Sequence, residues 1–397
     1  MAYFRNNTVN LLNLHYAIHS LALTGGGAFF AVYLLKSGVP TAVVLAAVAA
    51  ILLGRFAIRP SVLVLARRIG LKPLVIGGTL VAGVQYLLLP EVHDVGLSLL
   101  AFCVVSSVGD TYYWTSYHAF FASLGDTEHR GHQVGAREAI AALVGIVGPL
   151  ATGWALTVLG PRVAFGANAV VLVLSALPIV WTPNVKVAWH VPGVYRAALP
   201  GALLFAADGW MVAGNWLVWS IALFLALGES FSAFGGAMAL AAVVGAVSGL
   251  VLGRLIDTGH GVRAAAVALG VLVLIIAFRA MSYGSAPLAV IANACGALVS
   301  CIYVPALGTA IYNQAKSSPC ALRFHIAAEG GWDLGGATAS LISAALLWLG
   351  APLGVCILLS LASVPASFVL LRRYYAGARA ATETHATPVA MSELSGP

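Results

Sequence analysis

Ionisable side chains lie inside long apolar runs of this 397-residue chain, where a charge is hardest to accommodate. Placing such a group at the centre of a bilayer costs about 2.5–3.5 kcal/mol on insertion scales, so these residues usually face a polar interior and mark a transport pathway. Proton transfer and binding of a polar solute are the chemistries that they support there. The residues concerned are His15, His19, Asp110, Glu138, Asp208, Glu329 and Asp333.

His15 and His19 are four residues apart in the first apolar run, so a helix puts both imidazoles on one face, one turn apart. Such a pair can relay protons, hydrogen-bond a polar solute or bind a metal; alternatively, it only touches the membrane interface. A metal would need further ligands. We therefore interpret both histidines as candidates for solute binding and assign no metal ligand.

The fourth apolar run carries a polar and aromatic stripe. Its members recur at three- and four-residue spacing, which places them along one helix face. An acid shielded from water suits reversible protonation, and aromatic rings suit a partly apolar solute. The alternative is a packing stripe in which a neighbouring hydroxyl satisfies the acid. The stripe consists of Asp110, Tyr113, Trp114, Tyr117 and His118. We expect Asp110 to couple protons, and the solute-binding candidates are Tyr113, Tyr117 and His118.

The eleventh apolar run places His325, Glu329 and Asp333 at successive i, i+4 steps. One helix face then carries all three, which suits passage of a proton between the two sides of a membrane. Glu138, beside Arg137 at the start of the fifth run, either couples protons or forms an internal charge pair. The proton-coupling candidates are therefore Asp110, Glu138, His325, Glu329 and Asp333.

The seventh apolar run contains Asp208 and Asn215, which are seven residues apart and nearly aligned on a helix. We interpret both as solute-binding candidates. Trp216 and Trp219 of the same run fit an aromatic belt at the outer membrane interface, where tryptophan is common. Arg279, near the end of the ninth run, is expected to extend to the interface.

The composition makes lipid the solvent of this chain. Hydrophobic residues make up 61%, charged residues 8%, and the mean hydropathy is +0.96, whereas soluble domains carry about 25% charged residues. A span needs about 20 apolar residues, so the sequence predicts an all-helical protein with about twelve spans, the first a retained helix rather than a signal peptide. The runs are 11–35, 41–58, 73–90, 96–121, 136–159, 162–182, 198–228, 231–253, 264–283, 286–312, 326–349 and 351–371.

The formal net charge of +7 indicates membrane topology rather than a nucleic-acid partner. With the amino terminus in the cytoplasm, only Lys36, Arg162 and Arg279 fall near the outer side, and the other basic residues fall on or near the inner one. The positive-inside rule then predicts a protein of the cell inner membrane with both termini cytoplasmic. The five cysteines show no CxxC spacing and are expected to be small core residues.

The chain divides into two halves that echo each other. The longest internal polar interruption follows the sixth run, which predicts an N-terminal six-helix bundle (1–183), a cytoplasmic linker (184–197), a C-terminal six-helix bundle (198–375) and a polar cytoplasmic tail (376–397). Internal duplication, common among secondary transporters, explains three matches at offsets of 199, 190 and 193 residues. These are Leu53-Gly54-Arg55 with Leu252-Gly253-Arg254, Tyr113 with Tyr303, and Arg130-x-His132 with Arg323-x-His325.

On this layout and two motifs, the chain resembles the major facilitator superfamily over nearly its whole length. That family's signature after the second span is Gly, three residues, Asp and then a basic residue. Here Ile58 replaces the acid in the first half, and Thr258 replaces the base in the second. The resemblance implies a gating role for the residues that each copy retains, which are Gly54, Arg59, Gly253 and Asp257.

The second motif is the stretch from Gly145 to Gly153 in the fifth run, which is similar to the glycine-proline stretch of many antiporters in that family. Small residues let helices approach closely, and neighbours satisfy the carbonyl that a proline frees. Gly148 and Pro149 therefore join the gating candidates. The motif favours exchange or export, and a close-packing helix face is the alternative.

The sequence shows no nucleophile elbow, Walker A loop or HExxH pattern. We therefore expect a transporter, not an enzyme or ATP-driven pump, and no cofactor. We predict a monomer in the lipid bilayer that moves a small organic solute by proton-coupled secondary transport, in exchange or efflux. The resemblance implies that it alternates between inward-open and outward-open states.

Two other classes stay open. The first is a carrier of metal or inorganic ions that uses the intramembrane histidines and acids, although few methionines and scattered cysteines disfavour a soft metal. The second is a receptor or scaffold built on a transporter fold.

Overall fold

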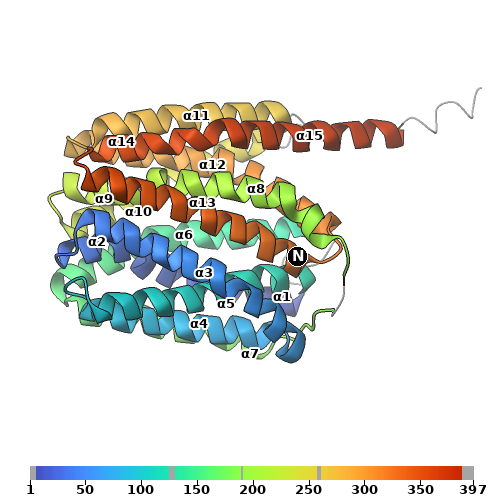
Figure 1. Ribbon diagram of the computed structural model, residues 1–397, viewed down its shortest axis with the longest axis horizontal. Helices are drawn as coiled ribbons and strands as arrows, with labels where there is room; N and C mark the ends of the chain where they lie inside the picture. Colours follow the sequence, from blue (N-terminus) through green and yellow to red (C-terminus); the bar gives the residue numbers. More distant parts are fainter. Residues whose placement is uncertain (1–5, 125–129, 189–190, 257–260, 387–397) are drawn as a thin grey trace, which may run out of the picture.

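Every regular element in the described part of the chain is a helix. The computed structural model describes residues 6–124, 130–188, 191–256 and 261–386, and within these ranges the side chains of 122, 130–142, 250–256, 261, 300 and 378–386 lie outside the description. The helices form twelve rod-like segments that run nearly parallel to the long axis of the molecule (Figure 1).

The first six segments extend from α1 to α7. The first segment combines three elements, and a short 3₁₀ turn follows the third. The bounds are α1 (Asn7–Ala22), η2 (Leu23–Gly27), α2 (Ala28–Lys36), α3 (Thr41–Ile69), α4 (Leu71–Leu88), η3 (Leu89–Glu91), α5 (Leu97–Leu124), α6 (Arg130–Val158) and α7 (Pro161–Val180).

The last six segments extend from α8 to α15, and the seventh and twelfth are each interrupted by a short irregular turn. The bounds are α8 (Val194–Val212), η4 (Ala213–Val218), α9 (Trp219–Ala226), α10 (Phe231–Ile256), α11 (Gly261–Ser282), α12 (Ala286–Ser317), α13 (Ala321–Trp348), α14 (Leu353–Leu358), η5 (Leu359–Ser363) and α15 (Val364–Ala386).

The segments are built to cross a membrane. Within the described residues, nine helices are long and apolar enough to do so, and Leu143–Val158 of α6 is a shorter apolar helix. The 29 residues of α3 extend about 43 Å, more than the roughly 30 Å of bilayer hydrocarbon. Leu97 and Leu274 are 80% and 70% exposed, which suits a surface in contact with lipid. The prediction of an all-helical membrane protein with about twelve spans is confirmed.

Both ends of the helical bundle can be recognised in Figure 1. Helix α1 begins and α15 ends at the right of the view, here called the terminal end. The joins from α2 to α3, from α9 to α10 and from α13 to α14 lie at the left, here called the opposite end.

The two halves share π-helical turns at equivalent places. These turns, η2 and η4, interrupt the first and seventh segments, and they start 190 residues apart by subtraction of their first positions. In η2 the Tyr86 ring fills the space where a Gly26 side chain would lie. In η4 the Asn215 carbonyl accepts a hydrogen bond from Arg279, which is 193 positions after Tyr86. The repetition agrees with internal duplication, and such turns occur frequently at functional sites.

Helices α6 and α10 bring the halves together near the opposite end. A Cβ atom on Gly153 would lie 2.6 Å from the Phe231 carbonyl oxygen, and one on Gly235 would collide with the Pro149 carbonyl. Only glycine therefore permits this backbone approach. Gly148 makes a similar contact with Thr24 in the first segment.

Helices α3 and α13 form the second contact between the halves, and they lie side by side in Figure 1. A small apolar cluster of Ala49, Leu52 and Ala337 fills this interface, with Trp332 packed against it. The main contacts between the halves are therefore α3 with α13 and α6 with α10, and α5 also contacts α13.

Candidate functional site

A buried network of charged side chains joins the two halves at the α3–α13 contact. Arg59 of α3 forms ion pairs with Glu329 and Asp333 of α13. Arg55 Nε lies 3.0 Å from Asp333 Oδ1, and Arg55 Nη1 lies 3.6 Å from Asp110 Oδ2 on α5. Arg59 and Asp333 are 1% and 0% exposed, so the centre of the network is shielded from solvent.

Helical spacing positions the network. Arg55 and Arg59 are four residues apart on α3, as are Glu329 and Asp333 on α13, so each pair shares a helix face. Thr115 of α5 completes the arrangement, since its hydroxyl accepts a hydrogen bond from Arg59 Nη1 and donates one of 3.1 Å to Glu329 Oε2. Three helices thus converge on one set of ion pairs.

The network contains one more acid than base. Arg55 and Arg59 face the carboxyl groups of Asp110, Glu329 and Asp333, so full ionisation leaves one uncompensated negative charge. An uncompensated charge away from water is costly. Glu329 Oε1 is buried and has no hydrogen-bond partner among the described residues. One proton would neutralise the network, and this oxygen is an open position for it.

The network lies toward the terminal end of the bundle. Glu329 is eight residues after the start of α13, which begins at that end, and eight residues of helix rise about 12 Å. Because the ion pairs join α3 to α13, they hold the terminal side of the two halves together.

Imidazole rings make a further contact between the halves, on the terminal side of the network. His118 of α5 and His325 of α13 stack with centroids 5.5 Å apart. The Tyr312 hydroxyl lies 3.4 Å from His118 Nδ1. His325 therefore continues the face of Glu329 and Asp333 toward the terminal end, and the structure places it against a ring of the other half.

The first half holds a buried polar and aromatic cluster. His15 Nδ1 lies 2.6 Å from the Ser175 carbonyl oxygen and Nε2 lies 3.1 Å from the Tyr113 hydroxyl. Because a carbonyl only accepts, Nδ1 carries a proton, and a neutral ring then accepts from Tyr113. The His19 ring stacks on Tyr113 at 3.8 Å, and Tyr113 stacks on Tyr117 at 5.4 Å. These four candidates for solute binding therefore lie together.

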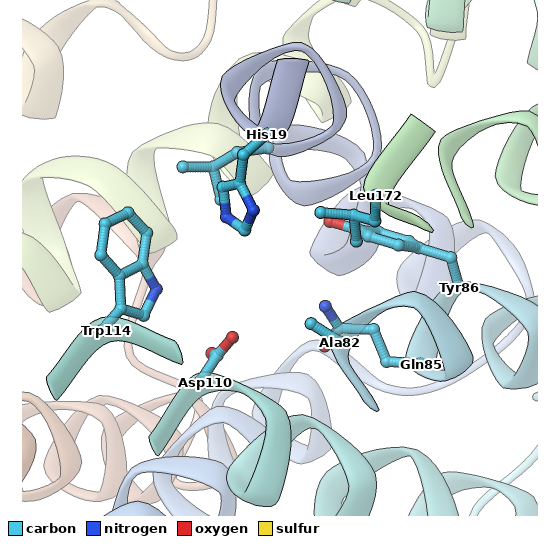
Figure 2. A pocket seen from close by; sticks show the side chains of 8 residues that line it. His19, Ala82, Gln85, Tyr86, Asp110, Trp114 and Leu172 are labelled. Atoms are coloured by element: carbon cyan, nitrogen blue, oxygen red, sulfur yellow. The ribbon is translucent and has the colours of Figure 1, made fainter. Parts of the chain in front are cut away.

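A pocket beside this cluster connects it with the charged network. Figure 2 shows the His19 ring and the Asp110 carboxylate facing its interior, with Trp114 on one side and Gln85 and Tyr86 on the other. The pocket is small, with a cavity volume of about 20 Å³, which is enough for about one water molecule. Asp110 borders this pocket and also faces Arg55. A solute would therefore need an opening of the bundle to enter.

The second half holds its own buried acid. Asp208 of α8 accepts a hydrogen bond of 3.1 Å from the Tyr303 hydroxyl at Oδ1 and one of 3.1 Å from Trp332 Nε1 at Oδ2. The Arg55 guanidinium lies over the Trp332 ring, 5.4 Å from its centroid. Trp332 therefore touches both Asp208 and the network.

Two expectations from the sequence are wrong in the second half. Arg279 does not extend to the interface: it is 7% exposed, its Nη1 donates a hydrogen bond of 2.8 Å to Asn215 Oδ1, and its guanidinium lies over the Trp219 ring. Trp219 is not in an aromatic belt, since it is 2% exposed and donates to Asn293 Oδ1. Both side chains turn inward because partners on neighbouring helices satisfy their N–H groups.

The structure describes the contacts of only some of the gating candidates. Gly54 lies against α5, where a Cβ atom would be 2.5 Å from Ser107 Oγ, so it serves packing within the first half. Arg59 forms its ion pairs with α13 instead of with an acid in its own motif. The gating candidates Gly253 and Asp257 and the proton-coupling candidate Glu138 lie outside the part of the chain whose side chains the structure describes.

Sequence reasoning did not single out Arg55, Thr115, Tyr303, Trp332 and Arg279 as site residues. Arg55 carried a signal, because it is four residues before Arg59 in an apolar run and mirrors the spacing of Glu329 and Asp333. Tyr303 carried one as the repeat counterpart of Tyr113, and Arg279 as a basic residue in an apolar run. Thr115 and Trp332 carried none, since hydroxyl and indole groups are common in spans. Only their contacts reveal them.

Metal ligation finds no support in the described side chains. Among them, no group of three or more His, Cys, Asp or Glu residues is arranged to hold a metal ion. The five cysteines are free thiols.

The fold is that of a polytopic helical membrane protein, with a buried charged network between two six-segment halves. The family model described as "Major Facilitator Superfamily" matches residues 12–195. The crystal structure of the human organic anion transporter MFSD10 (TETRAN) is similar with a TM-score of 0.68 at 14% sequence identity, covering 92% of this chain and 99% of that one. Among curated proteins, none matches the sequence. The first half of the chain is therefore similar to the major facilitator superfamily, and the whole chain shares the fold of a solved transporter of that kind.

Proposed function

We propose that this chain is a proton-coupled secondary active transporter that moves a small organic solute by alternating access. The observation that carries the proposal is the buried network of two arginines and three acids between the halves. Its odd acid gives a proton a place to bind, and its position at the α3–α13 contact links that proton to opening and closing.

Protonation would act on the gate through the ion pairs. A proton on Glu329 removes the charge that faces Arg59 and weakens this contact between the halves. The terminal end can then open while α6 and α10 stay packed at the opposite end. In the reverse state, loss of the proton restores the ion pairs and closes the terminal end. Two alternating contacts of this kind are what rocking of one half against the other requires.

The direction of each state follows from the charge distribution. Basic residues gather at the terminal end, so we place this end in the cytoplasm of a cell whose inner membrane holds the protein. The terminal end then opens inward, and the α6–α10 contact opens outward. The buried network lies within a single chain, which supports a monomer as the working unit.

The test uses purified protein in proteoliposomes loaded with a pH-sensitive dye. Candidate organic solutes are added outside one at a time, and proton movement and solute uptake are followed together. We expect at least one solute to move protons. Glu329→Gln should lose proton movement and uphill accumulation while retaining solute exchange.

The matched control is Glu91→Gln, which removes an exposed carboxyl group that pairs with Arg162 at 3.0 Å. It should behave as the wild type. Solute accumulation that never moves protons, or unchanged proton movement in Glu329→Gln, would contradict the proposal.

A further inference from the structure

We infer that Asp208, Tyr303 and Trp332 form a recognition site for the ammonium group of an organic cation, and that Arg55 occupies part of this site while the terminal end is closed. The inference rests on the proposed transport function and names the class of its solute.

The first argument is the state of Asp208. Its side chain is 8% exposed, and no ion pair joins it to a Lys, Arg or His among the described residues. An ionised carboxylate has about four acceptor positions, and Tyr303 and Trp332 use two of them. The carboxylate is thus held in place by two donors and retains free acceptor positions for a third.

The second argument is the ring beside it. Trp332 donates its N–H to Asp208 and carries the Arg55 guanidinium over its face at 5.4 Å. Cations are attracted to the face of an indole, and the attraction increases away from water. In the closed state this ring therefore already binds a cation, which is the Arg55 guanidinium of the charged network.

The two observations together describe an exchange. Arg55 belongs to α3 and lies near Asp110 of its own half, so separation of the halves breaks its ion pair with Asp333 and moves it away from α13. The face of Trp332 is then free next to the Asp208 carboxylate. An organic ammonium group fits both, because the carboxylate neutralises its charge and the ring contacts its alkyl surface. Binding of solute would favour opening by taking the place of Arg55.

The charge balance favours a cation over an anion. Asp208 adds a fourth acid to the three in the network, against two arginines. The equivalent pair in the first half is His15 with Tyr113, at offsets of 193 and 190 residues from Asp208 and Tyr303 and with the same 3.1 Å hydrogen bond. The first half therefore has an imidazole where the second half has a carboxylate, and only the second half offers an acid to a cation at this place.

The test measures equilibrium binding of radiolabelled tetraphenylphosphonium to detergent-solubilised protein, with no pH gradient. Two competitors share a benzyl group and differ in charge: benzyltrimethylammonium and phenylmethanesulfonate. We expect saturable binding of the phosphonium, displacement by the ammonium and none by the sulfonate. Asp208→Asn should weaken binding at least tenfold, and the control Asp94→Asn, at an exposed loop residue, should not.

A second pair of variants distinguishes loss of the Trp332 ring face from loss of folding. Trp332→Leu should weaken binding about tenfold, whereas Trp332→Phe, which keeps a ring face, should stay within threefold. Each variant is first checked by gel filtration and thermal unfolding, and the Trp332 pair decides if Asp208→Asn does not fold. Trp210→Phe on α8 is the matched control, because its N–H bonds Leu359 instead.

Three results would overturn the inference: no saturable binding by folded wild type, displacement by the sulfonate, or unchanged affinity in both Asp208→Asn and Trp332→Leu. The outcome is independent of proton coupling. Because binding is measured without a pH gradient, lost phosphonium binding in a wild type that still moves protons removes this inference alone. Intact binding with absent proton movement removes the proposed function alone.

Discussion

Arg59 and Glu329 are 270 positions apart in the chain and form a buried ion pair between α3 and α13. The guanidinium belongs to one half of the molecule and the carboxylate to the other. Each charge is stable away from water only because the other is present. Separation of the halves therefore requires loss of this pair.

The first prediction concerns the stability of that pair. Arg59→Met leaves two acids of α13 facing one arginine and should destabilise the protein by about 3–5 kcal/mol, because it strands a buried charge. Adding Glu329→Gln removes one of the stranded charges and should restore much of the loss. Unfolding free energies of the wild type, both single variants and the double variant measure the coupling. Additive losses would show that the pair does not hold the halves together.

The second prediction concerns Asp110. Asp110→Asn leaves two acids and two arginines, so the network is neutral without a proton. Solute exchange should continue, whereas accumulation driven by a pH gradient should fall to the equilibrium level. Proteoliposomes with and without the gradient provide the measurement, and Asp94→Asn is the control. Gradient-driven accumulation at the wild-type level in Asp110→Asn would remove this residue from coupling.

The third prediction concerns the close approach of α6 and α10. The Cβ atom in Gly235→Ala would meet the Pro149 carbonyl, so the helices must separate at a cost of about 1–3 kcal/mol. Gly236→Ala is a matched control on the next residue, where a Cβ atom meets nothing within 4 Å. Thermal unfolding of the purified proteins should show a lower midpoint for the first variant only. Equal midpoints would mean that this contact does not limit stability.

The fourth prediction concerns orientation. If the terminal end is cytoplasmic, cysteines placed at Asp94 or Glu229 react with an impermeant thiol reagent added outside intact cells, and one at Lys186 does not. The measurement uses a variant whose five native cysteines are replaced. The reverse labelling pattern would exchange the inward and outward labels of both contacts.

The sequence by itself determined the solvent and the layout of this protein. Its apolar runs require lipid, their lengths give twelve helices, and the spacing of His325, Glu329 and Asp333 gives a titratable face on one of them. These conclusions depend on composition and helical periodicity, which are local properties. They predicted the acids of the network without their partners.

The tertiary structure alone decided which side chains meet. Nothing in the sequence pairs Arg59 with Glu329, or sets Trp332 between Asp208 and Arg55, because helix packing and not chain distance brings them together. The same reason explains why Arg279 was wrongly placed at the interface. A long basic side chain extends to water when it has no partner, and the carbonyl and amide of Asn215 provide partners inside the bundle.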